Sequence, residues 1–427
     1  MSEGQSLTPA NAEVVARLCG AEPVLVDVRP AGDALPGMTG STVLTSGPPL
    51  PWREYFGGQR AAIIGGALFE GLATDAADAD RKLAAGRIRL GACHDHGSVG
   101  SLAGIYTASM PVLVVENRAG GNRGYCNLFE GPSPARLNYG VYNDQVRQSL
   151  LNLRDVIGPA LGEAIRGAGG IPLRPIMRRA LHMGDELHSR NAAATLLFGR
   201  ELSPAILALA ARQPEAARQL LSYLGSDYVF LRISMAASKA TADAGHGVEG
   251  SSVVSAMAFS CREFGIRVSG LGNTWFRAPM PKVEGKFFPG FTVEDVEYMG
   301  GESVINETVG LGGFAQAAAF ALQEYQGGSP EEMVAANLAM YRITLAEHPE
   351  LKIPFLGFRG VPVGIEVERV LDTGVVPVMD IGLAGKKGGQ IGAGLLRAPL
   401  DCFRAAADAL ARRPKPSASH PATEQRG

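Results

Sequence analysis

The stretch IRLGACHDHGSVGSLAGIYTASMPVLVVEN, residues 88–117, decides how this chain of 427 residues is interpreted. Its glycines fall between two apolar runs, a pattern typical of a turn that joins two strands. The stretch therefore predicts a strand, a glycine-rich turn and a second strand. The turn also carries two histidines and an aspartate, so the chain passes here from structural scaffold to a candidate functional site.

Helical and extended patterns alternate on both sides of this stretch. Residues 11–20 have the apolar spacing of a short helix, and PVLVDV, residues 23–28, has the continuous apolar run of a buried parallel strand. A helix is expected over 61–85. Downstream, apolar residues recur at i, i+3 and i+4 over 143–166 and 203–224, which predicts further helices.

The changes in periodicity and glycine content predict an α/β protein with several lobes. Compact domains stop growing near about 250–300 residues, so a chain of this length needs more than one. We expect an N-terminal α/β lobe over 1–143, a helical lobe over 144–225 and a glycine-rich α+β lobe over 226–412. The polar segment 413–427 is expected to be a disordered tail.

Charge and hydropathy describe a folded protein without a basic surface. The net charge is −2, with 46% hydrophobic and 19% charged residues, so no nucleic-acid partner is expected. The N-terminus lacks the pattern of a signal peptide, and no apolar run reaches the roughly 18 residues of a membrane span. We expect a cytoplasmic protein with no membrane contact. The five cysteines form no C-x-x-C pair, which indicates reduced, buried thiols.

The first candidate site residues are His94 and His96. In an extended segment, residues two apart point to the same side, so the two imidazoles would share a face and Asp95 would point away. Imidazoles have a near-neutral pKa and suit proton transfer or anion contact. The surrounding glycines would let backbone N–H groups approach an anion. The alternative is that both histidines only hydrogen-bond across a turn.

A second candidate cluster is HMGDELHSRN, residues 182–191. Its polar members are His182, Asp185, Glu186, His188, Arg190 and Asn191. On a helix, His182 and Glu186 would be neighbours at i, i+4, and Asp185 and His188 at i, i+3. We expect Asp185 and His188 to act in acid–base catalysis and the last two residues to contact substrate. The segment lacks the HExxH order of zinc hydrolases, so no metal is expected. The alternative for Asp185 is a role in capping a helix.

Lys239, Arg267 and Ser269, farther along the chain, are further candidates for contact with substrate. Lys239 follows the strand-like run YVFLRIS and would hold an anion at a strand-to-helix junction, or would otherwise be an ordinary exposed lysine. Arg267 lies inside the apolar run FGIRVSG, where a guanidinium is costly unless it is paired, and Ser269 follows it. It suits capture of a carboxylate or phosphate. The alternative is a structural salt bridge with Glu302 or Glu307.

Glycine-rich segments near the C-terminus supply further candidate donors for an anion. Arg359 in PFLGFRGVPVG follows the same argument as the previous arginine. Lys386 and Gln390 lie in AGKKGGQIGAG, where glycines again permit close backbone approach. We expect Arg359 to contact substrate.

Eight ordered blocks between about residues 20 and 410 resemble the YlbE-like family, which includes the large subunit of oxamate carbamoyltransferase in allantoin degradation, a branch of purine metabolism. The blocks are GACHDHGSVGSLAGIYTASMPVLVVEN, HMGDELHSRNAA, SMAASKATADA, FGIRVSG, WFRAP, PGF, HPELKIPFLGFRG and GQIGAGL. The resemblance implies a transferase that interconverts oxalurate plus phosphate with oxamate plus carbamoyl phosphate. It implies no cofactor, and it implies a hetero-oligomer whose companion subunits include one that resembles the acyl-CoA synthetase alpha subunit.

Two alternatives to this function stay open. The chain would act as a non-catalytic assembly subunit of an acyl-CoA-synthetase-like complex, or as a related enzyme on another ureido or amide substrate. Under the leading interpretation, the reaction must hold two anions side by side. We therefore expect His94, His96, Asp185, His188, Lys239 and Arg267 to converge within one cleft.

Overall fold

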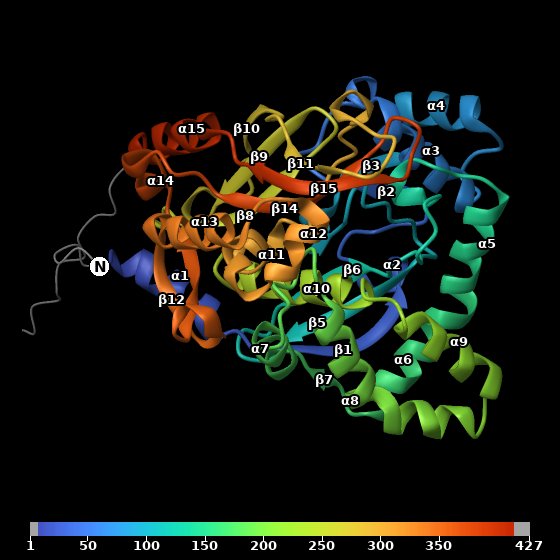
Figure 1. Cartoon of the computed structure of the whole chain (residues 1–427). Helices are drawn as coiled ribbons and strands as arrows, with labels where there is room; N and C mark the ends of the chain where they lie inside the picture. Colours follow the sequence, from blue (N-terminus) through green and yellow to red (C-terminus); the bar gives the residue numbers. More distant parts are fainter. Residues whose placement is uncertain (1–6, 414–427) are drawn as a thin grey trace, which may run out of the picture.

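The computed structural model describes residues 7–413 and confirms an α/β fold in which helices and strands are interleaved along the chain (Figure 1). The strands are β1 (Pro23–Pro30), β2 (Thr42–Thr45), β3 (Arg89–Ala92), β4 (Ser98–Val99), β5 (Pro111–Asn117), β6 (Arg123–Asn127), β7 (Ile171–Pro172), β8 (Val254–Phe259), β9 (Glu263–Val268), β10 (Phe276–Pro279), β11 (Glu284–Phe287), β12 (Thr344–Ile353), β13 (Arg359–Ile365), β14 (Val378–Ala384) and β15 (Gln390–Arg397). The helices are α1 (Pro9–Gly20), α2 (Ala31–Ala34), α3 (Gly57–Phe69), α4 (Ala76–Ala84), α5 (Asp144–Asn152), α6 (Gly158–Gly167), α7 (Arg174–His182), α8 (Ala192–Ala210), α9 (Pro214–Leu224), α10 (Val229–Ala244), α11 (Ile305–Thr308), α12 (Gln323–Gln326), α13 (Pro330–Ile343), α14 (Val367–Thr373) and α15 (Leu400–Ala411). The tail expected over 413–427 lies, from residue 414 on, outside the described residues.

The largest sheet has the strand order β4-β6-β5-β1-β7. The prediction of a parallel strand at 23–28 is wrong, because β1 pairs antiparallel with both β5 and β7. Helices α6 and α10 both pack on β1. A strand covered by helices is apolar along its whole length whatever its direction, and this explains the misleading pattern.

Helix α10 is the central helix of the molecule and lies against β5 and β6 (Figure 1). The prediction of a strand over YVFLRIS is wrong, because this run forms the first turns of α10. Most of the 16 residues of α10 are buried, so the sequence has no polar face to reveal a helical period. Its aromatic and β-branched residues then resemble a strand.

The single helix expected over 61–85 is two helices, α3 and α4. Gly71 has a φ of +74°, which ends the first helix in a left-handed turn. The Asp75 side chain accepts a hydrogen bond from the backbone N–H of Asp78 at 2.8 Å and so caps the second. The helices expected at 11–20, 143–166 and 203–224 are confirmed, although the last two are each interrupted.

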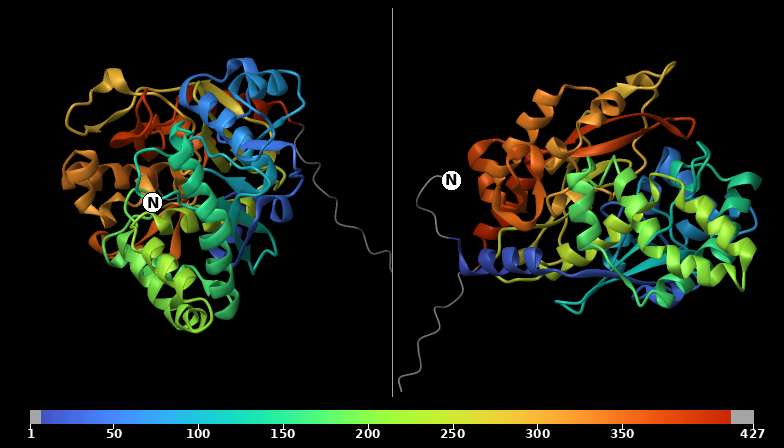
Figure 2. Two further views of the ribbon diagram at one scale, coloured as in Figure 1. Left: turned by 90° about the vertical axis from the view of Figure 1, so that its right-hand side faces the viewer. Right: turned by 60° about the horizontal axis from the view of Figure 1, so that its bottom comes forward.

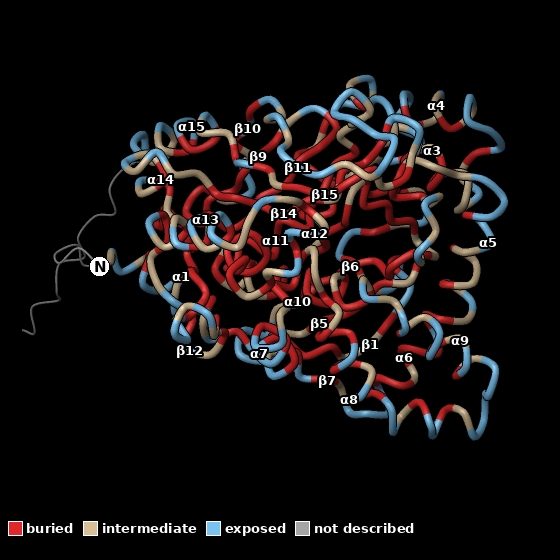
Figure 3. The backbone as a smooth tube through the Cα atoms, viewed as in Figure 1, coloured by how far each residue is buried: buried red, intermediate tan, exposed pale blue. Residues whose placement is uncertain are grey.

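Three large apolar clusters form the interior, which is continuous under an exposed surface (Figure 3). The first includes Leu113, Phe198 and Ile305, one residue from each expected lobe. Helix α1 packs against β12 and β13, so an N-terminal helix lies beside strands from the C-terminal part of the chain. Figure 2 shows the orange and red C-terminal segments together on one side of the molecule. The boundaries of the three lobes stay a prediction.

Helix α8 is long and apolar enough by composition to cross a membrane. Phe198 and Leu202 on this helix are fully buried in the first apolar cluster. Leu196 and Leu207 on the same helix are exposed, so packing in the core explains only part of its apolar composition.

Candidate functional site

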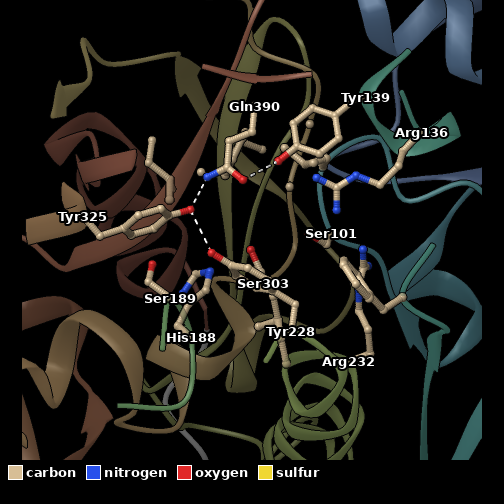
Figure 4. Close-up of a pocket in the computed structure, with 18 residues that line it drawn as sticks. Ser101, Arg136, Tyr139, His188, Ser189, Tyr228, Arg232, Ser303, Tyr325 and Gln390 are labelled. Atoms are coloured by element: carbon tan, nitrogen blue, oxygen red, sulfur yellow. Dashed lines mark hydrogen bonds between the residues drawn. The ribbon is translucent and has the colours of Figure 1, made fainter. Parts of the chain in front are cut away.

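A cavity of about 70 Å³ lies where the start of α10 meets β14, β15 and the loops around residues 101, 130, 188 and 301 (Figure 4). A buried water occupies about 10–15 Å³ on this measure, so the cavity has room for several waters or one small ligand. Its lining mixes aromatic rings with two guanidiniums, an imidazole and several hydroxyls. Such a mixture is typical of sites for small polar ligands.

Two arginines supply the positive charge of the cavity. Arg232, in the first turn of α10, is 4% exposed and donates from Nη1 to Asn127 Oδ1 at 2.9 Å. The Arg136 guanidinium lies over the rings of Tyr139 at 4.5 Å and Phe129 at 5.4 Å. Among the described residues neither arginine forms an ion pair, and the Nε of each is buried without a hydrogen-bond partner. Unpaired guanidiniums at a cavity wall favour an anionic ligand.

The loop that carries Arg136 is held by the buried carboxyl of Glu130. This carboxyl accepts the backbone N–H of Leu137 at 2.6 Å and that of Asn138 at 3.0 Å. Burial raises the pKa of Glu130, and these hydrogen bonds and the two cavity arginines oppose the rise. Because backbone donors occupy its oxygens, Glu130 fixes the loop and leaves the guanidiniums available for a ligand.

His188 lies on the side of the cavity opposite the two arginines (Figure 4). Its Nδ1 is 2.7 Å from Glu307 Oε1, so the other ring nitrogen, Nε2, is left for a ligand. Burial alone would lower the pKa of His188, but the charge and hydrogen bond of Glu307, with the charge of Asp380, outweigh it and raise the pKa above its ordinary value. A carboxylate-bound imidazole facing a cavity is suited to proton transfer.

Four polar side chains from separate segments form a connected row across the cavity (Figure 4). Tyr139 donates to Gln390 at 3.2 Å, Gln390 contacts Tyr325, and the hydroxyls of Tyr325 and Tyr228 are 3.0 Å apart. Burial raises the pKa of Tyr139 to about 12, so this phenol is neutral and available as a donor. The row joins the ends of α10 and β15 to the arginine side of the cavity.

The loop 100–104 reaches the cavity through Ser101 and Leu102. Glu302 holds it in place, because its two oxygens accept the N–H of Gly100 at 2.8 Å and of Gly47 at 3.0 Å. Leu102 has a φ of 53°, a conformation that costs a bulky residue energy and is common at functional sites.

Comparisons with known proteins identify the family of this chain. The family described as "Oxamate carbamoyltransferase subunit AllG" matches residues 88–303. The oxamate carbamoyltransferase subunit AllG of Escherichia coli is 40% identical over 412 residues, 95% of this chain and 98% of that protein. This chain belongs to the oxamate carbamoyltransferase subunit AllG family. The resemblance in the ordered sequence blocks is thereby confirmed.

Two further relatives share nearly the whole AllG-family fold. An uncharacterized protein of Escherichia coli, YahG, is 41% identical over 403 residues, 94% of this chain and 85% of that protein. The crystal structure of a conserved protein of unknown function from Enterococcus faecalis matches with a TM-score of 0.91 and 41% identity, covering 94% of this chain and 97% of that one. The fold is therefore present in relatives whose names assign them no reaction.

The structure separates the sequence candidates of this AllG-family chain into two groups. In the first group, Lys239 Nζ is 3.1 Å from His94 Nδ1 and 2.8 Å from Asp243. The prediction of an extended segment is wrong here, because residues 93–96 form a 3₁₀ turn. His94 is therefore buried, whereas His96 turns to Pro36 O at 2.7 Å. Burial and the charge of Lys239 hold the pKa of His94 well below its ordinary value.

Arg267 belongs to the same group as Lys239. Its guanidinium forms an ion pair with Asp95 and lies over the Trp275 ring at 4.4 Å, so its partner is neither of the two glutamates that we had considered. Lys239 lies in the third turn of α10, and the prediction of a lysine at a strand-to-helix junction is therefore wrong. Ser269 donates to Gly245 O at 2.6 Å.

The second group surrounds His188. Helix α7 ends at His182, so the expected i, i+4 neighbourhood of His182 and Glu186 on one helix is wrong. Asp185 accepts the N–H of Ala194 in the first turn of α8 at 2.8 Å, which is the capping role considered as its alternative. Arg190 donates to Gly184 O at 3.0 Å, and Asn191 donates to His188 O at 2.7 Å.

Of the residues that the sequence singled out as candidates, His188 and Gln390 line the cavity. Arg359 is exposed and pairs with Glu347 at 2.6 Å, and Lys386 donates to Glu294 O at 2.6 Å. Sequence reasoning missed Arg136 and Arg232. The signal for Arg232 was present, because it interrupts an apolar run as Arg267 does. Arg136 lies in a Pro- and Gly-rich loop whose sequence has no period to distinguish it.

Proposed function

We propose that this chain provides the site at which a carbamoyl group moves between oxalurate and phosphate. The observation that carries the proposal is the pair of guanidiniums without carboxylate partners, Arg136 and Arg232, opposite the carboxylate-bound imidazole of His188. Both substrates and both products are small anions. With two guanidiniums that form no ion pair among the described residues, the cavity suits such anions in charge.

The reaction assigns each group a task. A phosphate oxygen attacks the carbamoyl carbon of oxalurate, the bond from that carbon to the oxamate nitrogen breaks, and the products are carbamoyl phosphate and oxamate. Arg136 and Arg232 hold the carboxylate and the phosphate next to each other. His188 accepts the proton of the attacking phosphate and returns it to the departing nitrogen, so protons balance.

The proposal places this chain among companion subunits in the cytoplasm. The family name describes a subunit, and one companion is expected to resemble the acyl-CoA synthetase alpha subunit. Lys239 and Arg267 each form an ion pair, with Asp243 and Asp95, and Lys239 also contacts His94, so we assign these residues no contact with the reacting atoms. The competing function is that of an assembly subunit whose partner carries the chemistry.

The test compares arginine variants in the assembled complex, supplied with oxalurate and phosphate, by the rate of carbamoyl phosphate formation. Arg232→Ala removes a desolvated partner of a substrate anion, which should cost about 2–5 kcal/mol, or roughly 30- to several-thousand-fold in kcat/KM. Arg359→Ala is the control, because its guanidinium is exposed and away from the cavity. Arg136→Ala should behave like Arg232→Ala.

The same experiment separates the competing function. An assembly subunit would give complexes of normal activity with both cavity variants, provided that they assemble. If Arg359→Ala lost activity while Arg232→Ala kept it, the reacting anions would bind outside this cavity. Oxalurate and other ureido compounds can be compared in the same assay to define the substrate.

A further inference from the structure

We infer that Glu186 and Asp380 are a buried carboxyl pair that shares one proton, and that this pair and Glu307 together position His188 and set the pH range in which it exchanges a proton with substrate. The role in exchange rests on the proposed function, whereas the shared proton does not. Glu186, Glu307 and Asp380 are positioning residues, since none of the three lines the cavity.

Glu307 connects His188 to Asp380, because one of its oxygens hydrogen-bonds both residues. It is fully buried on α11, and its Oε1 lies within 2.7 Å of His188 Nδ1, 2.9 Å of the Gly313 N–H and 3.0 Å of the Asp380 N–H. Three donors that converge on one oxygen favour the carboxylate form. Glu307 is therefore the anion, and His188 carries a proton on Nδ1.

Glu186 and Asp380 contact each other in the same buried region. Asp380, on β14, accepts from Gln316 Nε2 at 2.6 Å through Oδ1, and its side chain also hydrogen-bonds the Glu186 carboxyl. Among the described residues its other oxygen, Oδ2, has no nitrogen or hydroxyl donor. Two carboxyls can hydrogen-bond only when one of them is protonated. Glu186 also accepts the backbone N–H groups of His188 at 3.1 Å and Arg190 at 2.9 Å, so the proton is held between the two carboxyls and supplies the donor that Asp380 Oδ2 otherwise lacks.

The surrounding charges require this proton. The loop before α8 contributes Glu186 and His188, α11 contributes Glu307, and β14 contributes Asp380. Within the described part of the chain, no lysine or arginine forms an ion pair with these three carboxyls. The guanidinium of Arg190 pairs with Asp185. Three buried carboxylates beside one imidazolium would leave two negative charges uncompensated, and a shared proton removes one.

The pair supports His188 through its remaining negative charge. Burial raises the pKa of Glu186 well above its ordinary value, and burial together with the charge of Glu307 raises the pKa of Asp380. One negative charge on the pair and one on Glu307 then favour the imidazolium form of His188. The cluster thus raises the pKa of His188 above its ordinary value, so that the ring can both accept and release a proton.

Amide variants separate charge from shape. Asp380→Asn leaves Glu186 as the anion and replaces the shared proton with an amide donor, so the pair keeps one negative charge. Glu186→Gln does the same from the other side. The double variant Glu186→Gln with Asp380→Asn has no negative charge on the pair. Each single variant is therefore the matched control for the double variant.

The shared proton is tested on the isolated chain by infrared spectroscopy at neutral pH, where a protonated carboxyl absorbs at a higher frequency than a carboxylate. Each single variant should lose the signal of one protonated carboxyl. Glu302→Gln serves as a reference, because burial raises the pKa of Glu302 to about 8 and its signal should disappear independently. An unchanged signal in both single variants overturns the shared proton.

The effect on His188 is tested by NMR titration of the histidine-labelled chain, with His188→Gln to assign the resonance, and by the pH dependence of kcat/KM in the assembled complex. The pKa of His188 should stay raised in both single variants and fall in the double variant, and the acidic limb of the rate profile should move to lower pH with it. An unmoved His188 titration in the double variant overturns the inference. If the pKa of His188 falls in the double variant but the pH dependence of kcat/KM does not change, the carboxyl cluster does control His188, and His188 is rejected as the reacting group.

Discussion

A buried cation needs a partner, and the partner decides whether the cation is available for a ligand. Arg267 has the carboxylate of Asp95, and Lys239 has that of Asp243. Arg232 has only the neutral amide oxygen of Asn127. A guanidinium that is desolvated but not neutralised gains most from an incoming anion. The difference lies in one neighbouring oxygen, although all three side chains are equally buried.

Glu302 carries a prediction about stability. Burial raises its pKa from 4.5 to about 8, so the folded chain binds a proton more tightly than the unfolded chain. Its contribution to stability is therefore present at low pH and is lost as the pH rises from about 4.5 through 8. Glu302→Gln should unfold with a free energy about 1–3 kcal/mol lower near pH 5, because one glutamine oxygen cannot serve two N–H groups.

The difference in free energy of unfolding between the wild type and Glu302→Gln should close as the pH approaches 8, since only the wild type has a carboxyl proton at this position to lose. Urea unfolding at a series of pH values measures it, and other titrating groups cancel in the comparison. Curves that stay parallel over the whole range would show that Glu302 is ionised throughout.

Single residues show how far the sequence alone could lead. Asp185 and Arg267 were singled out because charge in an apolar or dense polar setting demands a partner, and both have one. That principle cannot say whether the partner is protein or ligand, because the partner comes from a distant segment. Arg136 has no such signal, since its place depends on the hydrogen bonds of Glu130 and on two aromatic rings.

At the scale of elements, periodicity predicted helices with a solvent-facing side and failed for elements covered on all sides. Helix α1, which has both buried and exposed residues, was expected at 11–20 and is present at Pro9–Gly20. Helix α10 and strand β1 have few polar positions because neighbouring elements enclose them. Their type and direction depend on contacts with segments far away in the chain, and local patterns do not contain this information.

The loop 100–104 carries the prediction at this scale. A Cβ on Gly100 would lie 2.3 Å from the Gly104 Cα, and because the obstructing atoms are backbone they cannot rotate away. Gly100→Ala should lower the free energy of unfolding by about 1–3 kcal/mol and lower activity, because Ser101 and Leu102 would leave their places in the cavity. Thermal unfolding and the carbamoyl phosphate assay measure the two effects.

Gly20→Ala is the control for this loop, since a Cβ there has nothing within 4 Å. It lies at the end of α1 and should change stability by no more than about 1 kcal/mol. Equal free energies of unfolding and equal activities of Gly100→Ala and Gly20→Ala would mean that the loop can shift without loss of stability or function. A loss of activity in Gly100→Ala without a loss of stability would show that only the positions of the lining residues are sensitive.

Across the whole molecule, the cavity combines residues from all three expected lobes. Ser101, His188 and Gln390 are separated by most of the chain, yet they line one space. No sequence pattern joins them, because their proximity results from contacts between segments far apart in the chain. The AllG-family match covers residues 88–303, and the 40% identical relative extends the likeness over 95% of the chain.

The last prediction concerns what the chain does by itself. The residues of this chain that line the cavity include Arg136, Arg232 and His188, so the chain supplies the anion-binding groups by itself. The isolated chain should therefore bind oxamate, as measured by calorimetry, and Arg232→Ala should weaken this binding. Carbamoyl transfer is a different matter, because the family name describes a subunit. The chain alone should form little or no carbamoyl phosphate from oxalurate and phosphate, and adding its companions should restore the reaction. Full activity without companions would reject the need for partners, whereas absent binding would show that a companion completes the cavity.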